Sequence, residues 1–360
     1  MSQSEPVKLA LIGCGNRGVN ALGVTMRDLP AIDLVAVSDV DEARMEAAAE
    51  QLGTDAEGDL ARLLARDELQ GVVVATSARW HVPVALEAVR AGKHILVEKP
   101  LADNAGVARE LAQAVQLAGL VGMVGYQLRF SSFAEQLKAE VQAVDPLQAL
   151  VTRQRGPFRQ QFFFPEHYGG IMDHLTHDIH LALWVMGGRP QSVYGSVTRG
   201  AILGDQTIEL VNAIVEFEGG RTATLVGSMH GIQTPNVVQV VGRRGTVTTF
   251  DRKTLRVVRH GGITAPIPAT PEGLETRQVE TAGERAPGRA GQGQAGRTGQ
   301  GQAAGDPTAT MLEHFADLIA GRVTAQRGAT LAEGADAVAV TQAAVEATRT
   351  GCRVQLSTLP

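Results

Sequence analysis

Residues 9–18, with the sequence LALIGCGNRG, decide the fold of the first part of the chain. An apolar run is followed by three glycines at the spacing G-x-G-x-x-G: Gly13, Gly15 and Gly18. Where such a run is a strand that leads into a helix, the first two glycines let backbone N–H groups approach a pyrophosphate, and the third lets helix and strand pack closely. The helix dipole then favours the phosphates. The stretch predicts a dinucleotide-binding turn, with Asn16 and Arg17 among its contacts.

Short apolar runs alternate with amphipathic stretches from Val7 to about Gly125. The runs are VKLALIG, DLVAVSD, GVVVAT, HILVEK and LVGMVGY, and helical patterns such as EARMEAAAEQL and GVARELAQAVQLA lie between them. Continuous apolar strands separated by helices are typical of a parallel sheet that is covered on both faces. We therefore expect residues 1–125 to form an α/β domain with a doubly wound parallel sheet of the Rossmann type.

The pattern changes beyond Gly125. Strand candidates follow one another from about Gln191 to Val258 without helices between them, among them IELVNAIVEFE and RTATLVGSMH. This arrangement indicates an antiparallel or mixed sheet. We expect residues 126–360 to form an α+β domain with an open sheet of this kind. Within it, residues 281–305 are rich in Gly, Gln and Ala without apolar periodicity, which predicts a surface loop.

Composition excludes several classes of protein. The 360 residues suffice for two domains, each with its own core. A formal net charge of -5 without a basic block argues against a nucleic-acid surface. The N-terminal residues lack the features of a secretory signal, and no apolar run reaches the roughly 20 residues that span a bilayer. Cys14 and Cys352 make no disulfide framework. We expect a soluble protein of the cytoplasm.

Asp39 ends the second apolar run, about 20 residues beyond the last glycine, where a carboxylate accepts hydrogen bonds from the adenosine ribose. It is also a candidate N-cap of the next helix, with Glu42 completing a capping box. A carboxylate at this position repels a 2′-phosphate, and Val40 follows it instead of an arginine, so NAD is expected in preference to NADP. Arg17 and Arg44 are close enough in the sequence to keep NADP possible.

Polar residues end two later strands of the expected sheet. Ligands of an open α/β sheet gather beyond the carboxyl ends of its strands. The run HILVEK ends in Glu98 and Lys99, and we expect the lysine to project towards the nicotinamide end of the cofactor. A solvated strand end is the alternative for this lysine. The run GVVVAT leads to three further candidates for the cofactor site: Thr76, Ser77 and His81.

Residues 169–184, GGIMDHLTHDIHLALW, place two aspartates and three histidines within eight residues. On a helix, four side chains of this stretch share one face, with His174 to the side: Asp173, His177, His180 and Trp184. A metal ion held by Asp173, His177 and His180, with water in an open position, is one interpretation. An acid/base pair accompanied by structural histidines is the other. The local sequence alone does not decide between them.

Five motifs together resemble the Gfo/Idh/MocA oxidoreductases, named for glucose–fructose oxidoreductase, inositol dehydrogenase and a rhizopine-catabolism protein. These motifs are LALIGCGNRG, SDVD, VEKPLA, GYQLRF and GGIMDHLTHDIHLALWVMGG, and they occur in the family's order and spacing. The resemblance implies a Rossmann domain, a second domain on an open mixed sheet, and a nicotinamide cofactor. It implies sugars, polyols or their keto derivatives as substrates. It also implies a homodimer or homotetramer formed through the exposed face of the second sheet.

The resemblance assigns Lys99 as the lysine of E-K-P, and Asp173 and His177 as the D-x-x-x-H pair. Hydride transfer from an alcohol to NAD requires a base for the hydroxyl proton and a fixed donor for the oxygen. A histidine titrates near neutral pH, so His177 is the expected acid/base. Lys99 is expected to hold the substrate oxygen, and Asp173 to bind a substrate hydroxyl or orient the other two. Glu98 is expected to support the lysine or the cofactor.

The helix departs from the family pattern at Leu175, where many relatives have glycine, and at His180, where they have aspartate. The identity of the substrate therefore stays open. The aromatic stretch before the helix offers candidates to wall a substrate pocket, with a plain core loop as the alternative: Phe162, Phe163, Phe164, His167 and Tyr168. The motif GYQLRF offers three residues that contact the substrate or brace the domain junction: Tyr126, Gln127 and Arg129.

These expectations combine into an NAD(P)-dependent oxidoreductase that acts on the CH–OH group of a sugar, an inositol-like polyol or a related keto compound. No metal is expected, because a catalytic metal needs no dinucleotide fold beside it and the lysine would be a second cation near it. Two alternatives stay open. One is a dinucleotide-binding sensor without turnover, since a fold does not determine a function. The other is a metal-dependent enzyme that uses Asp173, His177 and His180.

Overall fold

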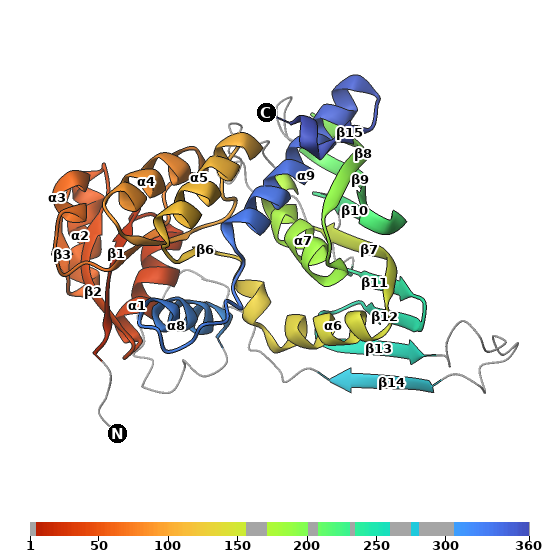
Figure 1. The fold of residues 1–360 in the computed structure, drawn as a ribbon, viewed down its shortest axis with the longest axis horizontal. Coiled ribbons are helices and arrows are strands. Elements are labelled where there is room, and N and C mark those ends of the chain that lie inside the picture. The colour runs from red at the N-terminus through yellow and green to blue at the C-terminus, as the bar shows by residue number, and fades with distance from the viewer. Residues whose placement is uncertain are drawn as a thin grey trace, which may run out of the picture. The chain divides into compact units, whose positions relative to one another are not determined.

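The computed structural model describes residues 5–155, 171–200, 208–230, 235–259, 275–280 and 306–359. The described residues divide into two units (Figure 1). The first unit contains residues 5–102, 107–131 and 306–335, and the second contains the rest of the described chain. A single boundary between folding domains at residue 125 stays a prediction. The expected loop at 281–305 lies outside the described residues.

The first unit is built on a six-stranded sheet in the order β3-β2-β1-β4-β5-β6. Each neighbouring pair in this sheet is parallel. This is the strand order of a dinucleotide-binding Rossmann domain, so the expected doubly wound fold is confirmed. The strands are β1 (Val7–Ile12), β2 (Ile32–Ser38), β3 (Asp55–Ala56), β4 (Gly71–Val74), β5 (His94–Val97) and β6 (Gly122–Val124).

Helices cover both faces of this sheet, with α4 and α5 on one side and α1 and α8 on the other (Figure 1). The first helical segment after β1 begins as a π-helical turn, η1, and continues as α1. The helical segments are η1 (Gly18–Gly23), α1 (Val24–Asp28), α2 (Glu42–Leu52), α3 (Leu60–Leu64), α4 (Ala78–Arg90), α5 (Ala105–Ala118), η2 (Gln127–Phe130) and α8 (Pro307–Ile319).

Helix α8 completes the core of the first unit although it comes from far along the chain. Asp306 caps it by accepting a hydrogen bond from the Thr308 backbone N–H at 2.9 Å. Its apolar face packs against side chains of the first helix, including Leu22 and Met26. Burial of each large apolar side chain contributes about 1.5–3 kcal/mol. The buried residues of this face are Ala309, Met311, Leu312, Phe315 and Ala316.

The second unit is built on a nine-stranded sheet in the order β14-β13-β12-β11-β7-β10-β9-β8-β15. Only β7 and β10 pair in parallel within this sheet, and the other pairs are antiparallel. The expected mixed, mostly antiparallel sheet is confirmed. The strands are β7 (Pro146–Gln154), β8 (Pro190–Arg199), β9 (Ile208–Phe217), β10 (Thr222–Ser228), β11 (Val238–Gly242), β12 (Gly245–Thr249), β13 (Thr254–Arg259), β14 (Glu275–Glu280) and β15 (Val354–Gln355).

One face of this sheet is covered by helices. Helix α6 (Ser132–Ala143) packs on β12 and β13, and α7 (Ile171–Met186) packs on β7, β10 and β9. Side chains alternate between the two faces along each strand, so the helix-covered face of β9 buries Val211, Ala213 and Val215. Helix α9 (Leu331–Thr350) and the short segments η5 (Glu218–Gly220) and η7 (Leu356–Thr358) complete the described elements.

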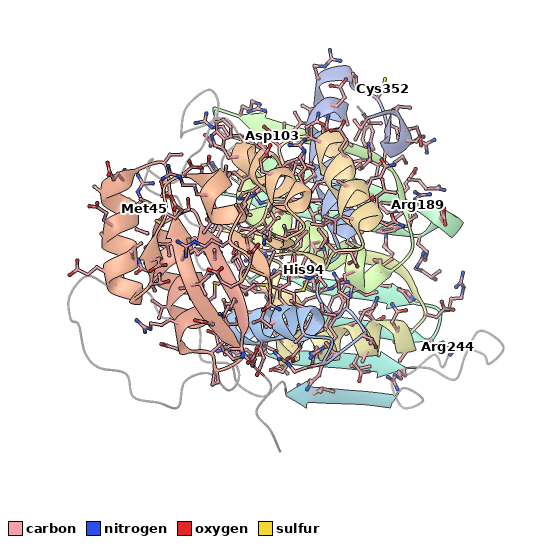
Figure 2. All side chains as sticks on the ribbon, turned by 60° about the vertical axis from the view of Figure 1, so that its left-hand side comes forward. Met45, His94, Asp103, Arg189, Arg244 and Cys352 are labelled. Atoms are coloured by element: carbon pink, nitrogen blue, oxygen red, sulfur yellow. The ribbon has the colours of Figure 1, made fainter. Side chains whose placement is uncertain are left out.

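The described helices include none that is long and apolar enough to cross a membrane. The two cysteines differ in their surroundings. Cys14 is buried in the first unit, and Cys352 is exposed near the C-terminus (Figure 2).

The glycines after β1 have different structural tasks. Gly13 has a φ of 105°, and a Cβ placed there would lie 2.6 Å from the Ala75 carbonyl carbon. A Cβ placed at Gly18 would lie 2.0 Å from the Gly13 carbonyl oxygen. Both obstacles are backbone atoms, which cannot rotate away as a side chain can. A Cβ at Gly15, by contrast, would have no atom within 4 Å.

We predict that Gly18→Ala lowers the free energy of unfolding by about 1–3 kcal/mol, because the added methyl group overpacks a backbone contact. Gly15→Ala is the matched control and should change the stability little, since space is open there. Thermal and urea unfolding of the two purified variants measure this difference. Equal stability of the two variants would contradict the assignment of Gly18 to strand–helix packing.

Candidate active site

The carboxyl ends of β1, β2 and β4 meet around the glycine loop. Gly13 N–H donates to the Ser38 carbonyl at 2.8 Å, and Ala75 N–H donates to the Ile12 carbonyl at 2.7 Å. Asn16 and Arg17 follow at the start of the helical segment. Open space above Gly15 leaves its backbone accessible, which is what a pyrophosphate at a helix N-terminus requires. The loop therefore fits the phosphates of a dinucleotide.

Asp39 lies directly beside this loop. Its Oδ2 accepts the Cys14 backbone N–H at 2.7 Å, its Oδ1 accepts the Asp41 backbone N–H at 2.9 Å, and 8% of its side chain is exposed. The alternative role of Asp39 as an N-cap is wrong, because Asp41 caps α2 by accepting the Arg44 backbone N–H at 3.0 Å. Each carboxylate oxygen has a second lone pair, so Asp39 can still accept hydroxyl groups of a ribose.

Two arginines bear on the choice of cofactor. Arg44 lies 3.8 Å from the Asp39 Oδ2 and also pairs with Asp41 at 3.0 Å. Arg17 is held by Glu98 instead, at 2.8 Å. Arg44 is therefore the arginine that lies beside the Asp39 carboxylate.

The thiol of Cys14 is unreactive. Burial, assisted by the nearby negative charge of Asp39, raises the pKa of its thiol to about 12, and Arg44 opposes this shift. Its Sγ donates to the Ser38 carbonyl at 3.6 Å. The thiol stays protonated at neutral pH and is no nucleophile.

Glu98 joins the glycine loop to the end of β5. Its Oε1 accepts the Arg17 Nε–H at 2.8 Å, its Oε2 accepts the Lys99 backbone N–H at 3.1 Å, and 4% of the residue is exposed. Arg17 also donates to Gln127, whose Oε1 accepts the Thr308 hydroxyl at 3.1 Å. A Cβ at Gly125 would lie 3.2 Å from Glu98. Glu98 thus links Arg17 to the backbone of Lys99, and Gln127 belongs to the same network. Support of the cofactor by Glu98 stays a prediction.

Lys99 follows Glu98 and is half-buried. Its backbone N–H is held by the Glu98 carboxylate. Within the described part of the chain, the Lys99 ammonium group makes no hydrogen bond or ion pair. A half-buried ammonium group without an internal partner can donate to a ligand without breaking a contact first.

His81 connects two loops at the ends of β4 and β5. Its Nδ1 lies 2.8 Å from the Pro100 carbonyl oxygen, and its Nε2 lies 3.0 Å from the Thr76 carbonyl oxygen. The residue is buried, with 2% exposed. Thr76 is half-buried and Ser77 is exposed, so these two present polar groups beside the glycine loop. His81 positions that segment, and its contact with a cofactor stays a prediction.

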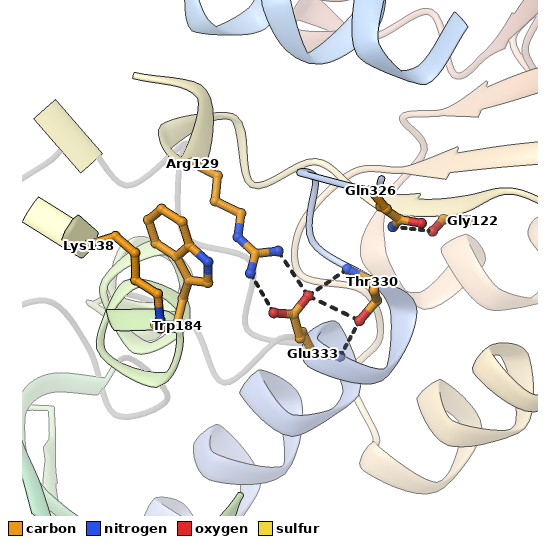
Figure 3. Close-up of polar contacts among 7 residues, drawn as sticks. All are labelled: Gly122, Arg129, Lys138, Trp184, Gln326, Thr330 and Glu333. Atoms are coloured by element: carbon orange, nitrogen blue, oxygen red, sulfur yellow. Dashed lines mark hydrogen bonds and ion pairs between the residues drawn. The ribbon is translucent and has the colours of Figure 1, made fainter. Parts of the chain in front are cut away.

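Arg129 is paired with Glu333 at the start of α9 (Figure 3). The distances are 2.9 Å from Nη1 to Oε2 and 2.5 Å from Nη2 to Oε1. Glu333 also accepts the Thr330 backbone N–H at 2.8 Å, which makes a capping box. Figure 3 also shows Gln326 donating to the Gly122 carbonyl at 3.0 Å. Arg129 thus links η2 to the start of α9, and Tyr126 beside it is buried. A contact of either residue with the substrate stays a prediction.

The histidine helix predicted from residues 169–184 is α7 of the second unit. His177 is half-buried, and His180 is buried with 4% exposed. The side chains of Asp173 and His174 lie outside the described part of the structure, as do the five aromatic and histidine candidates at 162–168. Among the side chains that are described, no group of three or more His, Cys, Asp or Glu residues is arranged to hold a metal ion.

Asp178, which sequence reasoning missed, anchors this helix. It has no exposed surface, its Oδ2 accepts the Arg153 Nε–H at 2.5 Å, and its Oδ1 accepts from Arg252. Burial lowers the pKa of Arg153 and of Arg155, and Asp178 opposes that shift. The signal in the sequence was its position on the stripe of Leu175 and Ala182, three residues after the one and four before the other.

Glu209 and His230 form a second pair that sequence reasoning missed. The His230 Nε2 lies 2.6 Å from the Glu209 Oε2, and the glutamate side chain is fully buried. The two residues are 21 positions apart, and only the pairing of β9 with β10 brings them together. No local pattern could have revealed the pair.

Comparisons with known proteins agree with this architecture. A family model described as an oxidoreductase family with an NAD-binding Rossmann fold matches residues 7–126. A second model, the GFO/IDH/MocA C-terminal domain, matches residues 144–248. Together the two models cover the Rossmann sheet, α7 and most of the second sheet.

Two curated relatives and one solved structure illustrate the similarity. The chain is 31% identical over 252 residues to an inositol 2-dehydrogenase of Rubrobacter xylanophilus, covering 68% of this chain and 71% of that protein. It is 26% identical over 258 residues to a scyllo-inositol 2-dehydrogenase (NAD(+)) of Bacillus subtilis, covering 67% and 73%. An oxidoreductase from Agrobacterium radiobacter, solved in complex with NAD+, L-tartaric acid and magnesium, superimposes with a TM-score of 0.78 at 18% identity, over 98% of this chain and 99% of that one. The matched glycine loop, the Rossmann strand order and these relatives show that the chain belongs to the Gfo/Idh/MocA family of NAD-binding oxidoreductases.

Proposed function

We propose that the protein transfers a hydride between NAD and the CH–OH carbon of a sugar, an inositol-like polyol or a related keto compound. The observation that carries this proposal is the half-buried Lys99 ammonium group, which lies at the carboxyl end of β5 without an internal partner among the described residues. The inositol dehydrogenases among its relatives support the substrate class.

The residues for the cofactor are those gathered around the glycine loop. Gly13, Gly15 and Gly18, with Asn16 and Arg17, would hold the pyrophosphate. Asp39 would accept the ribose hydroxyl groups and disfavour a 2′-phosphate. Bound NAD supplies the hydride acceptor or donor. The nicotinamide side of the site would be lined by Thr76, Ser77, His81, Glu98 and Lys99.

Three residues would carry the reaction. His177 would take the hydroxyl proton during oxidation and return it during reduction. Lys99 would donate a hydrogen bond to the substrate oxygen and stabilise negative charge on it. Asp173 would bind a neighbouring hydroxyl group or orient the imidazole. A sensor without turnover would need neither the lysine nor the histidine, and a metal-dependent enzyme would lose activity on chelation.

The substrate candidates divide into two groups. His167 and Tyr168 precede α7 in the chain and are proposed to contact the substrate directly. Gln127 binds Arg17, Arg129 binds Glu333, and Tyr126 is buried. We therefore propose that these three act on the substrate through the placement of loops.

We further propose that the open face of the second sheet pairs with a second copy of this chain, giving a homodimer or homotetramer. Tyr194 and Ile214 lie opposite each other on β8 and β9 and are 55% and 41% exposed. Val241 on β11 adds a third exposed apolar side chain. Exposed apolar side chains that lie together on a sheet face, as Tyr194 and Ile214 do, mark a candidate interaction surface.

The first prediction from the proposed function concerns the reaction. Lys99→Met and His177→Ala should each lower turnover by at least about 100-fold, because each removes a group that acts on the reacting oxygen or its proton. The affinity for NAD should stay within a few-fold in both variants. The assay follows the near-ultraviolet absorbance of reduced nicotinamide with a pool of cyclitols, aldoses and alditols at mildly alkaline pH.

Lys93→Met is the matched control for the lysine. Lys93 lies just before the opposite end of β5 and donates to the Arg66 and Leu69 carbonyls. This variant should keep its turnover. Unchanged turnover in Lys99→Met or His177→Ala would overturn the proposed mechanism, and tight NAD binding without any redox change would favour the sensor.

The second prediction concerns cofactor choice. Asp39→Ala should narrow the preference for NAD over NADP, because the variant lacks the carboxylate and keeps Arg44 beside the ribose site. The measurement is the ratio of kcat/KM with the two cofactors. Asp59→Ala is the control. It removes the cap of α3 and about 1 kcal/mol of stability. Because Asp59 pairs with Arg62 and not with Arg44, the variant should leave the preference unchanged. A ratio that does not move in Asp39→Ala would show that Asp39 only braces the loop.

The third prediction concerns assembly. Ile214→Arg should convert the oligomer to monomers, because the variant buries a charge in the proposed contact. Light scattering after size-exclusion chromatography measures the mass. Leu117→Arg, at a position 80% exposed on α5, is the control and should not change it. A monomeric unsubstituted protein, or an unchanged mass in Ile214→Arg, would contradict this assignment.

A further inference from the structure

Glu209 and His230 are titratable residues for which the proposed reaction has no task. Glu209 is fully buried on β9, and His230, just beyond β10, has 29% of its side chain exposed. The two polar atoms are 2.6 Å apart. Burial of a carboxylate is costly unless a partner compensates it. A carboxylate against one ring nitrogen sets the tautomer and the orientation of an imidazole.

The sheet register places Glu209 on the face that α7 covers. Side chains alternate along β9, so Glu209 points to the same side as the buried Val211 and Ala213. Met229 N–H donates to the Glu209 carbonyl at 2.9 Å, and Arg155 N–H donates to the Ser228 carbonyl at 2.9 Å. The ends of β7 and β10 and the start of β9 therefore meet at one edge, where His230 lies.

Helix α7 runs antiparallel to β10 over this edge. At its C-terminal end, the Met186 carbonyl accepts from Arg221, just before β10 begins, at 2.7 Å. Nearer its N-terminus, Asp178 pairs with Arg153, close to the end of β7. The residues that precede Asp178, including His177, thus lie towards the strand ends that lead to His230. The pair and the proposed acid/base occupy the same end of the second unit.

The hydrogen bonds of His230 determine which ring nitrogen donates a hydrogen bond and which one accepts. A neutral imidazole has one N–H and one lone pair. Because Nε2 lies against a carboxylate, the neutral ring of His230 has its hydrogen on Nε2 and its lone pair on Nδ1. Within the described part of the chain, Nδ1 makes no hydrogen bond. The backbone N–H of His230 donates to the Ser228 hydroxyl at 3.0 Å, which steadies the residue.

We infer that His230 is a further substrate-contacting residue, whose Nδ1 accepts a hydrogen bond from a substrate hydroxyl group other than the reacting one. Glu209 is the positioning residue that holds the ring in this tautomer. The ligand chemistry that fits is a polyhydroxylated compound that offers a hydroxyl donor next to its oxidised carbon. This inference rests on the proposed function and adds a determinant of specificity to it.

The first test is steady-state kinetics with the cyclitol, aldose or alditol that the unsubstituted protein oxidises best. His230→Ala should raise KM about ten-fold and keep kcat within about three-fold, because it removes one hydrogen bond made equally to substrate and transition state. His230→Asn should recover part of the loss, since its amide oxygen can accept the same hydrogen bond. Circular dichroism and NAD titration confirm that both variants fold.

The second test uses monodeoxy analogues of that substrate. In the unsubstituted protein, removal of the contacted hydroxyl should lower kcat/KM about ten-fold. In His230→Ala, kcat/KM for the same analogue should be little lower than for the full substrate, because the interaction is already absent. Glu209→Gln should reduce the preference for the substrate over the analogue that lacks this hydroxyl group. Glu216→Gln is the matched control on the same strand, where the carboxylate pairs with Arg353 at 2.8 Å. This control variant should keep the preference unchanged.

The outcomes distinguish failure of the inference about His230 from failure of the proposed function. Absence of turnover by the unsubstituted protein over the whole substrate pool would overturn both. Turnover by that protein together with an unchanged KM in folded His230→Ala and His230→Asn would overturn the inference alone. A loss confined to kcat would also overturn it, because the imidazole would then act on the reacting group. The inference is supported if His230→Ala and Glu209→Gln both lose the discrimination between the substrate and the analogue that lacks one particular hydroxyl group.

Discussion

The close approach of Gly18 to the carbonyl group of Gly13 is the constraint on which the first unit depends. A methyl group at Gly18 would lie 2.0 Å from that oxygen. Gly13 cannot move away, because its N–H binds the Ser38 carbonyl at 2.8 Å and its Cα faces Ala75. The ends of β1, β2 and β4 are thereby drawn together. This brings Asp39 to the loop and leaves the backbone at Gly15 open to a phosphate.

Two buried carboxylates, Glu98 and Asp178, connect segments that are far apart in the sequence. Glu98 links Arg17 of the glycine loop to the backbone of Lys99. Asp178 links α7 to the sheet through Arg153 and Arg252. Removal of the Asp178 carboxylate would leave the charges of Arg153 and Arg252 uncompensated, at a cost of about 3–5 kcal/mol. Both carboxylates adjoin a residue of the proposed reaction, Lys99 in one unit and His177 in the other.

Local patterns predicted some roles well and others poorly. The run of alternating strands and helices predicted the Rossmann sheet, because burial on both faces requires continuous apolar strands. Asp39 was placed beside the glycine loop by spacing alone. Its alternative role as a cap was wrong, since Asp41 stands one position before the helix and is better placed to accept its N–H groups. Arg129 belongs to a family motif, but its partner Glu333 lies 204 residues away.

The sequence by itself determined what depends on near neighbours: the glycine turn, the strand–helix alternation, the helix with Asp173 and His177, and the family to which these motifs belong. Only the tertiary structure decided which distant segments meet. It brought α8 into the core of the first unit, Asp178 to Arg153 and Arg252, and Glu209 to His230. The physical reason is that the hydrophobic effect is non-directional. Any apolar face can cover any other, and the partner of a buried charge is chosen by the packing that results.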